Sequence, residues 1–294
     1  MATLSQWVEG ARPRTLPAAV APVLVGTGAA FALGHGNSAF ALLALLVSLA
    51  LQVGVNYAND YSDGIRGTDK DRVGPVRLVG QGLANPENVK AAAMLSFASA
   101  ALLGLALVAL SGAYLMLLVG AASIAAAWYY TGGSRPYGYS GLGEVFVFVF
   151  FGLVATLGTT YTQTLSLSAA SLAGAVGVGA IASGILVANN LRDIPTDRSH
   201  GKRTLAVRLG ETRTRVLYTG LLTVALAAVL VIGLIHWTAL IALLSFVLAL
   251  PLVRRVRGGA IGKDLVPVLS GTGRFELVYA VLLALGLAAA HWTG

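Results

Sequence analysis

The sequence predicts an all-helical integral membrane protein, and three observations support this prediction. Only 11% of the 294 residues are charged, whereas soluble domains carry about 25%. Hydrophobic residues make up 56% of the chain, and the mean hydropathy is +0.79. The third observation is that the charges are absent from tracts long enough to cross a bilayer.

Five tracts contain no Asp, Glu, Lys or Arg, and their lengths are 45, 44, 47, 38 and 18 residues. One crossing of a hydrocarbon core takes about 20 apolar residues. Each of the first four tracts therefore holds two crossings, and the last holds one. The tracts are residues 15–59, 91–134, 145–191, 216–253 and 277–294.

Nine transmembrane helices are therefore expected, in one domain that covers residues 1–294. Small, polar or helix-breaking residues interrupt the long tracts at 34–37, 111–112, 166–168 and 236–237, where a turn is favoured. The expected helices cover residues 16–33, 39–60, 88–109, 113–130, 144–163, 169–191, 215–233, 238–253 and 275–292.

These turns place all 20 basic and all 12 acidic residues on one side of the membrane. Lys and Arg mark the cytoplasmic side, so the N-terminus is expected inside and the C-terminus outside. The acids need not follow that rule, and their presence on the same side indicates that the cytoplasmic loops hold the active site. A net charge of +8 does not indicate nucleic-acid binding in so apolar a chain. The absence of cysteine excludes a thiolate metal site.

Two of the charged loops resemble each other. Asn56-x-x-x-Asp60 and Asn189-x-x-x-Asp193 each close an expected helix, and each is followed by Asp-Arg and then Val-Arg-Leu. Such self-similarity predicts two pseudo-repeated halves around a central cavity. Chance similarity of two basic loops is the alternative.

The acids of these loops are candidate metal ligands. Residues four apart share a helix face, which aligns Asn56 with Asp60 and Asn189 with Asp193; Asp197 joins them if its helix continues that far. Oxygen ligands favour Mg²⁺, with Mn²⁺ as a possible substitute. The candidate metal ligands are Asn56, Asp60, Asp63, Asp69, Asp193 and Asp197.

Basic and aromatic residues accompany the acids, and each group has a simpler explanation. Asp63 and Asp69 could instead cap helices or pair with neighbouring cations. Cations can bind phosphate oxygens or only set the topology, and tyrosines can stabilise a carbocation or only anchor the interface. The candidate diphosphate ligands are Arg66, Arg77, Arg135, Lys202 and Arg203, and the candidate tyrosines are Tyr57, Tyr61, Tyr130 and Tyr137.

Together these residues resemble the UbiA superfamily of intramembrane aromatic prenyltransferases. The resemblance rests on the two Asn/Asp spacings on the second and sixth helices, on residues 130–144 with Tyr-Thr-Gly-Gly and Gly-Leu-Gly-Glu, and on Gly201-Lys-Arg-Thr-Leu205. One departure concerns the first motif. The family often carries a further acid four residues after the first Asp, but Gly64 stands there, and acids stand at 63 and 69.

The resemblance implies a Mg-dependent aromatic polyprenyltransferase of the bacterial cell membrane. The enzyme would transfer a polyprenyl group from a polyprenyl diphosphate to 1,4-dihydroxy-2-naphthoate, release pyrophosphate and carbon dioxide, and form demethylmenaquinone. No obligatory protein partner is implied. The implied catalytic residues are Asn56, Asp60, Asn189, Asp193 and Asp197.

Two alternatives to this function remain. A related enzyme could prenylate another aromatic acceptor, such as 4-hydroxybenzoate. A membrane transporter would also combine many helices with internal repeats.

Overall fold

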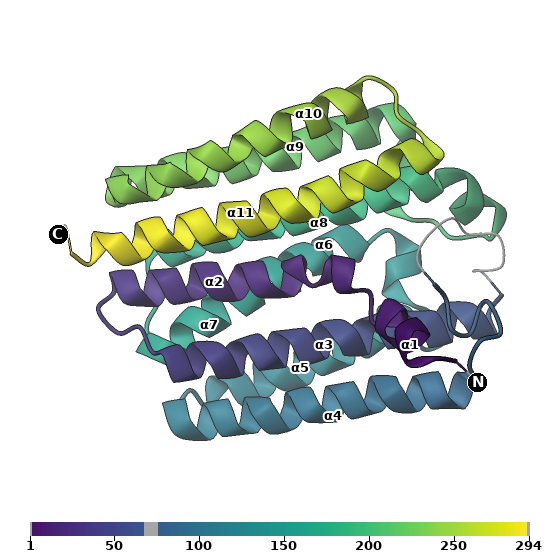
Figure 1. Cartoon of the computed structure of the whole chain (residues 1–294), viewed down its shortest axis with the longest axis horizontal. Coiled ribbons are helices and arrows are strands. Elements are labelled where there is room, and N and C mark those ends of the chain that lie inside the picture. The colour runs from purple at the N-terminus through teal and green to yellow at the C-terminus, as the bar shows by residue number, and fades with distance from the viewer. Residues whose placement is uncertain (1, 68–75, 293–294) are drawn as a thin grey trace.

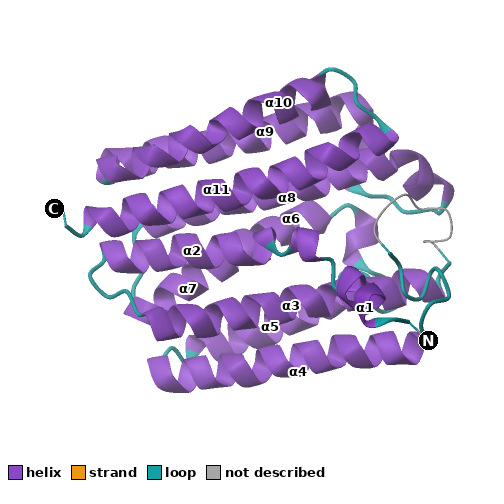
Figure 2. Cartoon of the chain, viewed as in Figure 1, coloured by secondary structure: helices purple, strands orange, loops and turns teal. Residues whose placement is uncertain are grey.

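The computed structural model describes residues 2–67 and 76–292. Across these residues all regular structure is helical and no strand occurs (Figure 2). The long helices lie side by side, and the two termini lie at opposite ends of the bundle (Figure 1). The candidate ligand Asp69 falls outside the described residues.

A helix occupies each of the nine predicted ranges, preceded by a short N-terminal helix. The α-helices are α1 (Leu4–Gly10), α2 (Pro17–Ala32), α3 (Ser38–Ile65), α4 (Pro86–Ser111), α5 (Leu115–Tyr129), α6 (Gly143–Val147), α7 (Ala155–Thr164), α8 (Ala169–Ser199), α9 (Leu205–Ile235), α10 (Phe246–Arg257) and α11 (Val266–Ala290). The 3₁₀ segments are η1 (Pro13–Thr15), η2 (Tyr137–Ser140), η4 (Trp237–Ser245) and η5 (Gly262–Leu265), and η3 (Phe148–Val154) is a π-helical segment between α6 and α7.

Seven of these helices are long and apolar enough to cross a membrane, and an eighth follows if α2 and the bent segment before it form one span. The remaining apolar helix, α5, has 15 residues, which extend only about 22 Å. The all-helical prediction is therefore confirmed among the described residues, whereas nine crossings stay a prediction.

The predicted turns coincide with local stop and start signals. The Asn37 side chain accepts hydrogen bonds from the first amides of α3, and Ser168 forms a capping box at the start of α8. Gly112 ends α4 with a φ of 72°, a left-handed conformation that glycine adopts without strain. Local sequence therefore determines these helix boundaries.

Two helices differ from simple expectation in ways that matter for their length. The expected helix 238–253 begins with nine residues of 3₁₀ helix, whose rise of about 2.0 Å per residue lengthens a short span. Helix α8 passes through Pro195 and continues to Ser199. Asn189, Asp193 and Asp197 therefore lie on one continuous helix.

The largest buried cluster is built from α2, α8, α9, α10, α11 and η4. Glycines allow its helices to approach closely. A Cβ at Gly28 would lie 2.6 Å from the Ala284 Cα, and a Cβ at Gly152 would lie 2.5 Å from the Gly179 Cα. Small residues at helix contacts are how apolar helices pack in a membrane. This cluster supports one wall of the site described next.

Candidate active site

The acids at the ends of α3 and α8 are buried. Asp60, Asp63, Asp193 and Asp197 are 0%, 3%, 4% and 7% exposed. Burying a carboxylate is costly unless it is paired or hydrogen-bonded. The partners of each acid therefore show what it does in the structure.

Lys202 and Tyr139 connect the end of α3 to the segments around α8. The Lys202 Nζ lies 3.4 Å from an Asp63 oxygen and 4.4 Å above the Tyr139 ring. The Tyr139 hydroxyl donates to Asp63, and the Tyr139 carbonyl accepts from the Arg203 amide. Asp63 is thus held by a cation and a hydroxyl from two distant segments.

The loop between α5 and α6 is also held against α3. Arg66 donates to the carbonyls of Thr131 and Gly133, and the Thr131 hydroxyl donates to the Asn59 side chain at 2.7 Å. The Tyr-Thr-Gly-Gly stretch is therefore fixed at the end of α3, where it brings Tyr139 to Asp63.

The α8 acids are held by other side chains. Arg192 makes a bidentate pair with Asp193, at 2.6 Å and 2.8 Å, and also donates to Asn189 at 2.9 Å. The Thr204 hydroxyl lies 3.5 Å from an Asp197 oxygen. Bidentate arginine pairs combine charge with directed hydrogen bonds, so the Asp193 carboxylate is oriented.

Asn56 and Asp60 have different partners from the other candidates. The Asn56 amide donates to the Ala11 carbonyl and the Thr15 hydroxyl. The Asp60 oxygens accept from the backbone amides of Leu78 and Val79. Both residues therefore bind neighbouring chain segments.

The remaining basic candidates separate by exposure. Lys202 and Arg77 are buried, and Arg66 is exposed but bonded to the carbonyls described above. Arg135 and Arg203 have exposed side chains. Of the basic candidates, Lys202 and Arg66 are therefore directly tied to the Asp63 cluster.

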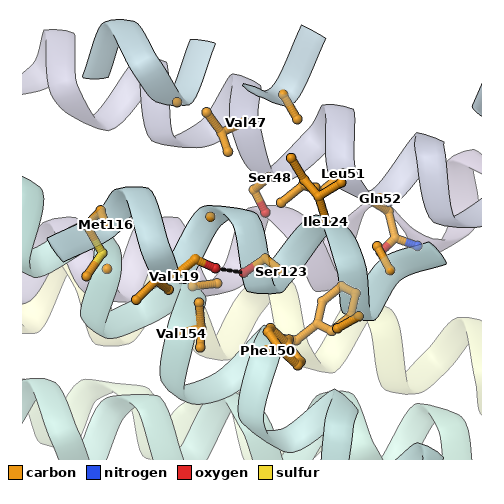
Figure 3. Close-up of a pocket in the computed structure, with 18 of the residues that line it drawn as sticks. Val47, Ser48, Leu51, Gln52, Met116, Val119, Ser123, Ile124, Phe150 and Val154 are labelled. Atoms are coloured by element: carbon orange, nitrogen blue, oxygen red, sulfur yellow. Dashed lines mark hydrogen bonds between the residues drawn. The ribbon is translucent and has the colours of Figure 1, made fainter. Parts of the chain in front are cut away.

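An apolar cavity of about 510 Å³ lies beside this polar cluster, between α3, α4, α5 and the α6–η3–α7 segment. Gln52 and Met116 lie at opposite ends of the lining shown in Figure 3. Gln52, Asn56 and Asn59 line it near the end of α3, and most of its other lining residues are aliphatic. The cavity can hold an apolar chain with a polar group at one end.

Two of the four candidate tyrosines line this cavity. Tyr130 and Tyr137 meet edge to face, with ring centroids 5.5 Å apart, and Tyr137 stacks on Phe146 at 3.9 Å. The Tyr137 hydroxyl donates to the Ala126 carbonyl, and burial raises its pKa above the ordinary value, so it stays neutral.

The other two tyrosines pack elsewhere. The Tyr57 hydroxyl donates to the Trp7 carbonyl of α1, and Tyr61 stacks on Trp128. Neither of these tyrosines is among the residues that line the cavity.

The donor chemistry of the described acids fits Mg²⁺, although no three acidic or His side chains gather as a ready-made metal site in residues 2–67 and 76–292. Mg²⁺ needs only one or two carboxylates when substrate phosphates and waters complete its shell. The partners of Asp63, Asp193 and Asp197 in the bonds given above are side chains, which can turn away when a cation arrives.

Sequence reasoning did not select several residues of the cluster. Asn59 and Asp63 repeat the Asn-x-x-x-Asp spacing three residues after Asn56 and Asp60, and that repeat was a usable signal. Arg192 and Tyr139 had no such signal, because their roles depend on which segments meet.

Glu144 was also not selected, although it ends the Gly-Leu-Gly-Glu motif. It is buried and accepts from the Asn190 side chain at 2.9 Å. The motif therefore ties the start of α6 to α8.

Known proteins resemble this chain along nearly its whole length. It is 58% identical to the 1,4-dihydroxy-2-naphthoate octaprenyltransferase of Mycobacterium tuberculosis, over 98% of both chains. It is 40% identical to the Escherichia coli protein of the same name, over 97% of this chain and 96% of the other.

The fold also has a solved counterpart. A UbiA homolog from Archaeoglobus fulgidus, solved with GPP and Mg²⁺, matches 97% of this chain and 99% of its own, with a TM-score of 0.72 at 15% identity. The sequence further matches the model of the UbiA prenyltransferase family over residues 19–266. The chain therefore belongs to the UbiA prenyltransferase family, whose members are multi-pass membrane proteins.

Proposed function

We propose that this protein transfers a polyprenyl group from a polyprenyl diphosphate to 1,4-dihydroxy-2-naphthoate in menaquinone synthesis. The observation that carries the proposal is the adjacency of a buried cluster of acids and cations to an apolar cavity. The cluster suits a diphosphate, and the cavity suits the attached hydrocarbon chain. The printed names of relatives at 40–58% identity support the choice of acceptor.

The metal assignment is narrower than the sequence alone suggested. Asp63, Asp193 and Asp197 would hold Mg²⁺, which when bound would neutralise diphosphate charge and assist its departure. Asp60 is left out of this set because its oxygens accept backbone amides.

The residues around the acids would carry the rest of the reaction. Lys202 and Arg77 would stabilise the charge that develops on the leaving diphosphate. The ring faces of Tyr130 and Tyr137 would stabilise the allylic carbocation, and the apolar cavity would keep water from it. The naphthoate ring carbon that bears the carboxylate then forms the new bond, and the carboxylate leaves as carbon dioxide.

Purified protein with Mg²⁺, a polyprenyl diphosphate and 1,4-dihydroxy-2-naphthoate should release pyrophosphate and yield demethylmenaquinone. Chelation should abolish the activity, and Mg²⁺ or Mn²⁺ should restore it. Preferred turnover of 4-hydroxybenzoate would refute the acceptor, and no prenylated product with any acceptor would favour a transporter.

The membrane arrangement is also a proposal. We infer nine spans in two pseudo-repeated halves, with the acid-bearing ends of α3 and α8 in the cytoplasm, the N-terminus inside and the C-terminus outside. The chain contains no cysteine, so single cysteines can be introduced without background. A cysteine at Ser140 should react with an impermeant thiol reagent only from the cytoplasmic side. One at Ser166 should react only from outside.

A further inference from the structure

Asp60 makes two hydrogen bonds that differ in kind from those of the other acids. Its Oδ2 accepts from the Leu78 amide at 2.7 Å, and its Oδ1 accepts from the Val79 amide at 3.1 Å. Hydrogen bonds to an ionised acceptor are short and about twice as strong as neutral ones. The residue is 0% exposed, so both bonds are shielded from water.

Gly64, one helical turn after Asp60, makes room for the same segment. A Cβ at position 64 would lie 2.4 Å from the Val79 Cγ1 and 3.2 Å from the Gly80 amide nitrogen. These distances leave no space for a side chain unless the segment moves. The position where the family often has another acid is therefore filled by residues 79–80.

Leu78 completes the docking. Its side chain is 0% exposed, and a Cβ at Gly10 would lie 2.8 Å from the Leu78 Cδ1. Segment 78–80 thus fits a notch formed by Asp60, Gly64 and Gly10. Arg77, the residue just before the notch, is 6% exposed.

The kind of partner separates Asp60 from Asp63 and Asp193. Asp63 is paired with Lys202, and Asp193 with Arg192. These cations can rotate toward a phosphate when a metal takes the carboxylate. The amides of Leu78 and Val79 cannot leave Asp60 unless the whole segment lifts.

We propose that Asp60 is a positioning residue that docks segment 77–80 on α3 and holds Arg77 in place, and that it is not a metal ligand. The assignment of Arg77 to the diphosphate rests on the proposed function, whereas the docking does not.

Hydrogen exchange followed by mass spectrometry on the full chain in nanodiscs tests the docking directly. In the wild type, peptides that cover Leu78 and Val79 should be protected. Asp60→Asn keeps the volume but offers one acceptor oxygen instead of two, so exchange there should speed up at least tenfold. Asp63→Asn is the matched control, and it should leave this protection unchanged.

Gly64→Ala provides a second variant that leaves every carboxylate intact. Its methyl group should displace Val79 and cause the same loss of protection. Gly220→Ala is its control, because a Cβ there meets no atom within 4 Å. If Asp60→Asn fails to fold, Gly64→Ala alone decides the docking.

Metal binding is measured separately, by titrating Mn²⁺ in the presence of pyrophosphate and following its electron paramagnetic resonance signal. Asp60→Asn and Gly64→Ala should agree within twofold in the Mn²⁺ concentration for half-saturation, whereas Asp63→Asn should need at least tenfold more. A fivefold or larger excess for Asp60→Asn over Gly64→Ala would overturn the proposal. Unchanged exchange at Leu78 and Val79 in both variants would overturn it as well.

Kinetics test the link to Arg77. Asp60→Asn and Arg77→Met should each raise the KM for polyprenyl diphosphate more than they lower kcat, and the double variant should be no worse than Arg77→Met alone. Additive effects would refute positioning through Arg77. An enzyme inactive toward every acceptor would refute the proposed function but would leave the exchange result interpretable.

Discussion

The ends of α3 and α8 carry the same Asn-x-x-x-Asp spacing but lie in different surroundings. In the most apolar 18-residue window of each helix, 72% of α8 is buried and only 17% of α3. Helix α8 belongs to the largest buried cluster, whereas α3 lines the cavity. A repeated sequence pattern thus serves as scaffold in one half and as a substrate-facing wall in the other.

The acids follow the same division. On α8, Asp193 is oriented by Arg192 of its own helix. On α3, Asp60 binds the following segment, and Asp63 reaches Lys202 and Tyr139 from distant parts of the chain. The α8 site is assembled locally, and the α3 site depends on tertiary contacts.

The strongest test of this comparison is Asp193→Asn. It removes a proposed metal ligand and leaves the buried Arg192 without its charged partner, so activity should fall about 10²- to 10³-fold. Pyrophosphate release measures the effect. Asp264→Asn is the control, because that acid is 71% exposed and should retain full activity. More than a tenth of wild-type activity in Asp193→Asn would contradict the assignment.

Lys202→Met tests the contact that joins the two regions. Loss of one charged hydrogen bond of about 1.5–3 kcal/mol should raise the KM for polyprenyl diphosphate roughly 10- to 100-fold. Steady-state kinetics over a range of diphosphate concentrations would show it. Lys263→Met, an exposed lysine, should behave as the wild type. A pure kcat effect would argue against a role in diphosphate binding.

Gly120→Leu tests the use of the cavity beside α3. Gly120 lines the cavity, and a Cβ there would meet no atom within 4 Å, so the larger side chain would occupy free space. Turnover of a long polyprenyl diphosphate should fall about tenfold, because losing a few buried methylenes costs on the order of 1–2 kcal/mol, and geranyl diphosphate should be little affected.

Gly220→Leu is the matched control, since position 220 is equally open but does not line the cavity. Equal losses for long and short substrates in Gly120→Leu would indicate general disruption of the fold rather than a filled cavity.

Tyr137→Phe should have the smallest effect. It keeps the ring that stacks on Phe146 and removes only the hydroxyl that donates to Ala126, so stability should fall by about 1 kcal/mol and activity less than threefold. Thermal unfolding and product formation measure the two effects. Tyr137→Leu, which also removes the ring face, should lose at least tenfold more activity than Tyr137→Phe, and equal activities would exclude a cation-stabilising role.

Much of the fold could be predicted from the sequence because the charge-free tracts record the cost of burying charge in a bilayer. Boundaries were readable where a cap stood in the chain, as at Asn37 and Ser168. The length of α5 was not readable, because periodicity alone does not say whether an apolar helix stops short of a full crossing. The 3₁₀ start of the helix after residue 236 also carried no local signal.

The candidate site was predicted as a set of residue types rather than as a set of partnerships. The i, i+4 spacing correctly aligned Asn189 with Asp193, whose side chains lie 3.5 Å apart. The same rule grouped Asn56 with Asp60, yet each contacts a different chain segment. Helical spacing determines the face on which a side chain lies, but not what packs against that face.

The sequence by itself determined that the chain is a helical membrane protein whose few acids gather at the ends of two similar helices. Local composition suffices for this, because apolar length and charge exclusion act within each segment. Only the tertiary structure decided which acid meets which partner. Those contacts join residues more than a hundred positions apart, as in Asp63 and Lys202, and they depend on how close the helices and loops can approach.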